Sequence, residues 1–324
     1  MDFPTRIRKR FSWQLAALTL CLLLAPLIMN SCSTSEYNTP VTPKTSATLL
    51  SPETLKTWVD SGIVNSTGFD RVVILDITSM ATYTAGHIPG AQFVNSGDIA
   101  QTRMEGPATD VTMVLDGSRM DALVQKYGID KNTTIVFTSG AASPGAGSVL
   151  TATRSYWIFR YWGFSKEKLK VLDGINFAWN ALYGLTPGDP PVPVPSTYSV
   201  KNNVQLRTDL RTSLAEMIQV AEGRLANAIP VDMRTTPATA SYAGNRGSTQ
   251  GVFKPGVPGD STTLPIDSVA FEGRMKRAQA LDYTTMLITG STITADNFRF
   301  KSADVLAAMF NAIGIDSTKI AHVY

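Results

Sequence analysis

The feature that most constrains the fold of this chain is a regular alternation of short apolar runs with helical patterns. Residues 71–76 form a continuous apolar run that ends in an acid, which predicts a parallel strand buried on both faces. A second such run, residues 134–137, follows an amphipathic helical pattern over residues 120–127. Strands that alternate with helices imply right-handed crossovers, so we predict an α/β fold with helices on both faces of a parallel sheet.

This alternation occurs twice along the 324 residues, a length that exceeds the usual size of one domain. Residues 121–130 align with residues 307–316, and both stretches end in Gly-Ile-Asp and continue into an apolar run. We therefore predict two related domains, residues 51–186 and residues 206–324. A stiff, proline-rich linker over residues 187–205 is expected to join them.

The N-terminal segment has the pattern of a bacterial export signal. Residues 1–31 combine a basic start with an apolar run, and the residues before Cys32 resemble a lipobox, at which the cysteine is diacylated and becomes the new N-terminus. An uncleaved membrane anchor is the alternative, since the run is about as long as a short span. Residues 32–50 begin with a Ser-, Thr- and Pro-rich stretch typical of a flexible tether.

These features predict a protein of the bacterial cell envelope that a lipid anchor holds on the periplasmic side of a membrane. Ser33, which follows the candidate lipidated cysteine, favours the outer membrane. The formal charge of +3 arises within the first ten residues, which contain four basic residues and one acidic residue. The near-neutral remainder has no basic stripe, so we expect no nucleic-acid partner, and no protein partner is indicated.

The cysteine count restricts the chemistry. The chain has two cysteines, Cys21 within the signal and Cys32 at the lipidation position. The exported part therefore has no cysteine for a disulfide, a redox pair or a thiolate nucleophile. With only His87 and His322 available as imidazole ligands, we expect no metal centre, and nothing indicates another cofactor.

The most specific motif lies in the first unit. Asp76-Ile-Thr is followed by Tyr83-Thr-Ala-Gly-His-Ile-Pro-Gly-Ala91, which resembles the Asp-x-Arg and Tyr-x-x-Gly-His-Ile-Pro-Gly-Ala signature of rhodanese-like sulfurtransferase domains. The second unit supplies Val231-Asp-Met-Arg234, a shorter match. The resemblance covers about residues 51–324 and implies two rhodanese-like domains in tandem, the second incomplete at its C-terminal end.

Most motif residues have a structural interpretation. Gly90 permits a backbone conformation that a Cβ would forbid, and His87 is more typical of a turn histidine bonded to the backbone than of a catalytic residue. Asp76 and Asp232, each at a strand end, are typical of turn-bonding acids. Arg234 has two open interpretations: it holds an anionic sulfur donor, or it forms an ion pair with Asp232 or a neighbouring acid.

The resemblance implies sulfur transfer through a cysteine thiolate, which takes sulfane sulfur from a small anion such as thiosulfate and passes it to a thiophile. The family's cysteine comes nine residues after the Asp of the Gly-Ile-Asp turn. That position is Ser139 in the first unit, or Thr138 if the strand shifts by one, and position 325 in the second, directly after Tyr324. A hydroxyl forms no persulfide, so the first unit lacks the nucleophile. Its loop over residues 139–147 is either a small-anion site or a plain connector.

Three explanations are open for position 325: a gene fragment or frameshift, a UGA codon read as selenocysteine, or a short protein. As written, the chain is expected to be inactive. The leading hypothesis is a rhodanese-like sulfurtransferase of the envelope, completed by a Cys or selenocysteine at position 325. The alternative is a non-catalytic rhodanese-fold lipoprotein that serves as a binding module.

Overall fold

The computed structural model describes residues 47–105, 108–140, 146–203, 205–234, 275–289 and 294–324. The predicted export signal, Cys32, most of the predicted tether and residues 141–145 of the loop after Ser139 lie outside the described residues.

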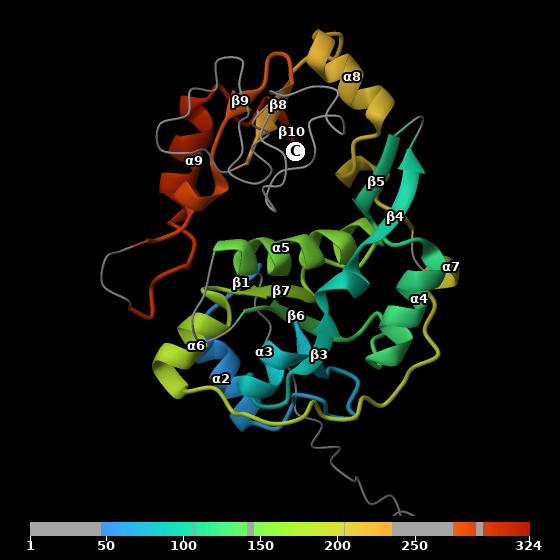
Figure 1. Ribbon diagram of the computed structural model, residues 1–324, viewed down its shortest axis with the longest axis vertical. Helices are drawn as coiled ribbons and strands as arrows, with labels where there is room; N and C mark the ends of the chain where they lie inside the picture. Colours follow the sequence, from blue (N-terminus) through green and yellow to red (C-terminus); the bar gives the residue numbers. More distant parts are fainter. Residues whose placement is uncertain (1–46, 106–107, 141–145, 204, 235–274, 290–293) are drawn as a thin grey trace, which may run out of the picture. The chain divides into compact units, whose positions relative to one another are not determined.

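The first unit is built on a five-stranded parallel sheet of order β1-β7-β6-β2-β3 (Figure 1). The strands are β1 (Leu49–Leu50), β2 (Val72–Thr78), β3 (Gln92–Asn95), β6 (Thr134–Thr138) and β7 (Leu169–Leu172). The central strands β2 and β6 pair in register from Val72 opposite Thr134 to Asp76 opposite Thr138. Their carboxyl ends therefore meet at one edge of the sheet, which we call the carboxyl edge; the opposite edge, where the strands begin, is the amino edge.

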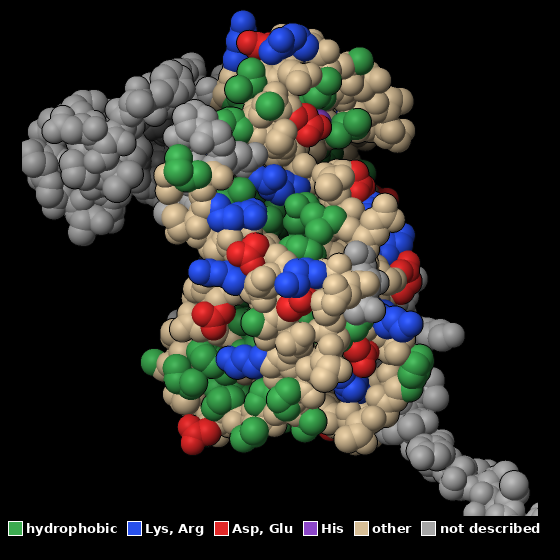
Figure 2. All heavy atoms as spheres, turned by 90° about the vertical axis from the view of Figure 1, so that its right-hand side faces the viewer, with side chains coloured by type: hydrophobic (Ala, Val, Ile, Leu, Met, Phe, Trp, Pro, Cys, Tyr) green, Lys and Arg blue, Asp and Glu red, His purple; other side chains and the backbone are tan. Residues whose placement is uncertain are grey.

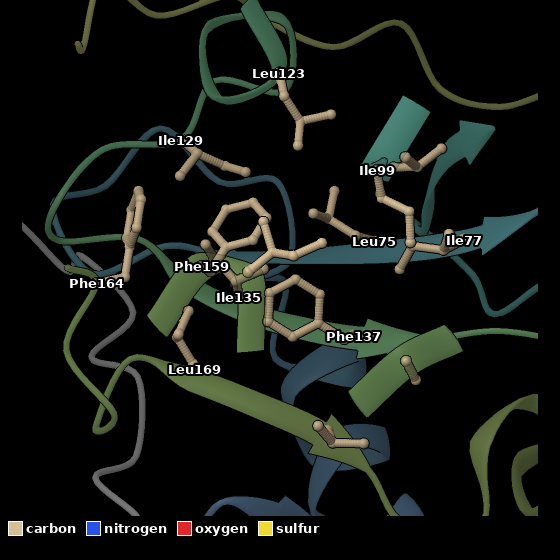
Figure 3. Packing of buried hydrophobic residues seen from close by; sticks show 14 of the residues in the cluster. Leu75, Ile77, Ile99, Leu123, Ile129, Ile135, Phe137, Phe159, Phe164 and Leu169 are labelled. Carbon is tan, nitrogen blue, oxygen red and sulfur yellow. The ribbon is translucent and has the colours of Figure 1, made fainter. Parts of the chain in front are cut away.

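Helices cover both faces of this sheet, as predicted. They are α2 (Pro52–Asp60), α3 (Met80–Ala85), α4 (Gly117–Lys126), α5 (Ala146–Tyr161) and α6 (Ile175–Tyr183). Alternate residues of β2 point to opposite faces, so Leu75 and Ile77 enter the cluster formed with α4 and α5 (Figure 3). Val72 and Ile74 enter the second cluster, formed with α2, α3 and α6. Burial on both faces is the reason that residues 72–75 of β2 form an unbroken apolar run and not an alternating pattern.

The second unit contains a smaller parallel sheet of order β10-β8-β9. Its strands are β8 (Ala228–Asp232), β9 (Gln279–Ala280) and β10 (Ile320–Val323), and its helices are α8 (Leu214–Glu222) and α9 (Ala303–Ala312). β8 and β10 pair from Ala228 opposite Ile320 to Val231 opposite Val323. This pairing repeats the relation between β2 and β6.

The structure also contains a two-stranded antiparallel hairpin, which the sequence did not predict. β4 (Gln101–Glu105) pairs with β5 (Ala108–Met113), after the short 3-10 helix η1 (Ser96–Ile99). The segment is mostly polar and has no strict apolar alternation, so periodicity alone gave no strand signal there. Further short elements are α7 (Val200–Asn203), η2 (Thr208–Leu210) and η4 (Tyr283–Met286). No helix in the described part of the chain is long and apolar enough to cross a membrane.

The proline-rich segment after α6 packs along α4. The amide of Ser196 donates to the carbonyl of Gln125 at 2.9 Å, and the side chain of Asp121 accepts a hydrogen bond from the amide of Val200 at 2.7 Å. Gly128, with φ +65°, leaves room for the segment, because a Cβ there would lie 2.2 Å from the carbonyl oxygen of Val194. The segment is therefore bound to the first unit over much of its length.

Candidate functional site

Asp76 of the motif and the predicted nucleophile position in the first unit meet at the carboxyl edge of β2 and β6. Asp76 lies directly opposite Thr138, and Ser139 is the first residue after β6. Asp76 and Thr138 are fully buried, and Ser139 is 4% exposed. The strand register thus puts Ser139, not Thr138, immediately beyond the sheet.

Ser139 is committed to a structural hydrogen bond. Its hydroxyl donates to the carbonyl oxygen of Ile77 at 2.6 Å, which ties the end of β6 to the end of β2. The hydroxyl is buried and the strand carbonyl holds its proton. Among the described residues this hydroxyl donates to the Ile77 carbonyl and to no base, so Ser139 links the ends of two strands.

Asn176, which sequence reasoning did not single out, organises this edge. Its side-chain amide donates to Asp76 Oδ2 at 2.8 Å and to the carbonyl of Gly140 at 2.9 Å, and its Oδ1 accepts from the Thr138 hydroxyl at 2.8 Å. The residue is fully buried in the first turn of α6, which follows Gly174 in the left-handed conformation (φ +82°). The only signal in the sequence was a polar residue at the start of a predicted apolar helix.

Burial dominates the electrostatics of Asp76. Removal from water raises the pKa of its carboxyl to about 7, and the hydrogen bond from Asn176 opposes that rise. Its second oxygen, Oδ1, has no hydrogen-bond partner among the described residues. Burial also raises the pKa of Tyr83, and the charge of Asp76 adds to that effect. Thr78 occupies the place of the motif's arginine. The donor to the Asp76 carboxyl is therefore the side-chain amide of Asn176 and not a guanidinium.

His87 and Gly90 shape the turn between α3 and β3. The His87 ring stacks on Tyr83 with centroids 4.0 Å apart, and its Nδ1 lies 3.0 Å from the Tyr83 carbonyl oxygen. Gly90 adopts φ +80°, and its carbonyl accepts a hydrogen bond from the side chain of Asn65 at 2.7 Å. His87 also exchanges backbone hydrogen bonds with Thr186, so its described contacts fix the turn.

In the second unit an arginine accompanies the strand-end acid. Arg234 donates from Nε to Asp232 Oδ1 at 2.8 Å and from Nη2 to Oδ2 at 2.6 Å. The Asp232 side chain is fully buried, whereas that of Arg234 is 35% exposed. The ion pair, one of the two interpretations of Arg234, is therefore present. Its role in holding an anionic donor stays a prediction.

Tyr324 takes the place in the second unit that Thr138 has in the first. Its amide donates to the carbonyl of Val231, and its carbonyl accepts from the amide of Met233, which continues the register so that Tyr324 lies opposite Asp232. Its hydroxyl donates to Asp232 Oδ2 at 3.3 Å, and its ring lies 5.5 Å from the Arg234 guanidinium.

The other histidine, His322, is buried on β10, where its Nδ1 lies 2.8 Å from the Thr212 hydroxyl. Within the described ranges no group of three His, Cys, Asp or Glu side chains is placed to hold a metal ion.

A protein-family comparison agrees with this geometry. Residues 52–182 match the family model described as "Rhodanese-like domain". The match includes both central strands, Ser139 and Asn176, so the site lies within it. A comparison with curated proteins found no match.

Solved structures share this α/β fold, and their similarity extends over most of the chain. The 3-mercaptopyruvate sulfotransferase SseA from Escherichia coli matches with a TM-score of 0.58 at 16% identity, over 86% of this chain and 87% of SseA. EanB in complex with ergothioneine matches with a TM-score of 0.58 at 17% identity, and YnjE with 0.55 at 18% identity. The chain spans about 60% of the EanB chain and 58% of the YnjE chain. At these identities the matches establish the fold alone.

Proposed function

We propose that this protein is a sulfurtransferase whose reactive group, a cysteine or selenocysteine, follows Tyr324 in the second unit. The observation that supports this most is the shared register: Asp232 lies opposite Tyr324 as Asp76 lies opposite Thr138. The group at position 325 then stands at the carboxyl end of a central strand. This is the position that the rhodanese resemblance assigns to the nucleophile.

The reaction at that position is a double displacement. The thiolate or selenolate attacks the outer sulfur of a donor such as thiosulfate, a new bond to that sulfur forms, and the donor's S–S bond breaks to release sulfite. A thiophile such as cyanide or a thiol then attacks the transferred sulfur and frees the nucleophile. The buried Asp232 accepts hydrogen bonds from the half-buried Arg234 and Tyr324, and in this proposal the three residues fix the end of the strand from which the nucleophile projects.

The test begins with the nucleotide sequence after codon 324. The chain, extended by whatever that frame encodes and with cysteine at position 325, is assayed for transfer of sulfur from thiosulfate to cyanide. We expect activity that a serine at position 325 abolishes. A frame that encodes no further loop, helix and strand, or an extended protein that transfers no sulfur, contradicts the proposal.

A second candidate function is favoured by the geometry of Ser139. Its buried hydroxyl bonds to the Ile77 carbonyl, so the first unit serves as a non-catalytic binding module. Titration with thiosulfate or sulfate, followed by the amide resonances of Gly140 and Gly147, tests whether this edge binds an anion. Binding is supported if the chemical shifts of these two amides alone change and the change saturates with the anion concentration. Unchanged resonances exclude binding at this edge.

We also propose that Cys32 carries the lipid anchor. Mass spectrometry of the N-terminal peptide from membranes is expected to show a diacylated Cys32. The variant Cys32→Ala is expected to be recovered without lipid. An unmodified N-terminal peptide that retains residues 1–31 would instead indicate an uncleaved anchor.

A further inference from the structure

The most exposed large hydrophobic side chains of the described residues come from two segments at one edge of the first sheet. Val192 is 91% exposed, Val194 is 78% exposed and Phe69 is 71% exposed. The prolines between and before the two valines are only half-buried, so within this segment the valines are the residues that face outward. Figure 2 shows hydrophobic side chains gathered at the lower end of the surface that it presents. Such a patch on a folded domain usually marks a surface that contacts something else.

All three side chains belong to the amino edge of the first sheet. Phe69 lies three residues before Val72, the first residue of β2. The neighbouring Arg71 donates a hydrogen bond to the carbonyl of Gly128, and Gly128 is the residue against which the Val194 backbone packs. The valines therefore lie near the same strand starts as Phe69.

The chain enters the domain at this edge as well. β1 runs parallel to β7, with Leu49 opposite Val171, so residue 47 lies at the amino edge. Lys170, whose side chain is almost fully buried, donates from Nζ to the carbonyl of Ala47 at 2.7 Å. A buried ammonium group is stable only with such partners. The N-terminal segment therefore enters the domain at the same edge of the sheet, at β1, which β7 and β6 separate from β2.

Charges next to Phe69 are arranged in pairs. Lys168 lies 2.7 Å from Asp70, and Arg71 lies 3.4 Å from Asp130. The two acids flanking the patch are therefore neutralised, which lowers the electrostatic cost of bringing this edge to a surface that carries negative charge.

We propose that Phe69, Val192 and Val194 form a surface that docks on the lipid bilayer to which Cys32 anchors the protein. The inference rests on the proposed lipidation of Cys32 and is independent of sulfur transfer. Residues 32–46 span at most about 50 Å when extended, so residue 47, at the amino edge, can lie no farther than this from the bilayer. Side chains of this kind insert among lipid headgroups, where apolar area is removed from water. The carboxyl edge, about 20 Å away along the seven residues of β2, then faces away from the membrane.

The absence of cysteine between residues 33 and 324 permits a direct test. The full lipidated protein carrying Val192→Cys is labelled with an environment-sensitive fluorophore and reconstituted in vesicles of phosphatidylethanolamine and phosphatidylglycerol. Nitroxide-bearing lipids quench fluorophores at the bilayer surface. The matched control is Met80→Cys, an apolar residue that is 45% exposed and lies just beyond the carboxyl end of β2.

We expect at least twofold stronger quenching at position 192 than at position 80. Adding Phe69→Ser and Val194→Ser is expected to remove that difference without changing the mass of the acylated N-terminal peptide. Equal quenching at the two positions overturns the proposal. A blue shift at position 192 that grows with protein concentration and needs no vesicles also overturns it, because a second copy of the chain then covers the patch. If the N-terminal peptide carries no lipid, the anchor on which this proposal rests is absent and the proposal fails. The sulfur-transfer assay still tests the proposed function separately.

Discussion

The buried carboxyl of Asp76 makes the stability of the first unit depend on pH. Burial raises its pKa to about 7, whereas an aspartate in an unfolded chain titrates near 3.9. Between these values the folded protein binds more protons than the unfolded one, so stability falls as pH rises from about 4 to about 7 and is level outside that window. A difference of about three pH units at 1.36 kcal/mol each corresponds to about 4 kcal/mol as an upper bound.

The variant Asp76→Asn removes this titration. The Asn side chain keeps an oxygen that accepts from Asn176 Nδ2, but it adds an amide group whose donors need partners, at a cost of about 1–3 kcal/mol. We therefore expect the variant to be more stable than the parent by about 1–3 kcal/mol at pH 8. At pH 4.5 we expect it to be no more stable than the parent.

Urea unfolding followed by tryptophan fluorescence measures this effect selectively, because every tryptophan after the predicted export signal lies in the first unit: Trp58, Trp157, Trp162 and Trp179. The control is Asp60→Asn, whose side chain is 58% exposed in an ion pair with Lys56. The reasoning is refuted if the difference in stability between pH 4.5 and pH 8 is the same for the parent and for Asp76→Asn.

Three further substitutions test the contacts around the two sites. Gly128→Ala is expected to destabilise the first unit by more than 1 kcal/mol in urea, since the residue has φ +65° and its Cβ would collide with the Val194 carbonyl; an unchanged midpoint contradicts this packing. Asn176→Ala leaves Thr138 and Asp76 short of partners and is expected to cost about 2–4 kcal/mol by the same fluorescence assay, with unchanged stability as the contrary result. Arg234→Gln leaves the Asp232 carboxylate buried without its cation, and we expect loss of about 3–5 kcal/mol, measured by hydrogen exchange of the β8 amides, with unaltered protection as the refutation.

Much of the fold was predictable because the central strands can be recognised from their own residues, without knowledge of distant contacts. β2 and β6 each contain an unbroken apolar run, residues 72–75 and 135–137, which follows from burial on both faces, and the helices between them have clear periodicity. The count from the Gly-Ile-Asp turn also led to Ser139, since turn and strand lengths are set by neighbouring residues. The β4–β5 hairpin was not predictable in this way, because its polar sequence is stabilised by pairing and not by burial in the core.

Asn176 was missed for a different reason. It lies 100 residues from Asp76 and 36 from Gly140, so its importance arises only when the sheet brings β2, β6 and the start of α6 together. Nothing local distinguishes a helix-start asparagine that caps its own backbone from one that bonds to other strands. Long-range polar contacts of this type need a three-dimensional arrangement before they can be assigned.

The two units use different chemistry to hold an acid at the same strand position. In the second unit the motif's arginine is present, and Arg234 grips Asp232 with two hydrogen bonds. In the first unit Thr78 stands at the position of that arginine. There the side-chain amide of Asn176 and a proton on the Asp76 carboxyl stabilise the buried acid. A guanidinium retains its charge at every physiological pH, whereas the proton on Asp76 is lost near neutrality. The single difference between Asp-x-Arg and Asp-x-Thr therefore leaves the first unit with a strand end whose stability responds to pH.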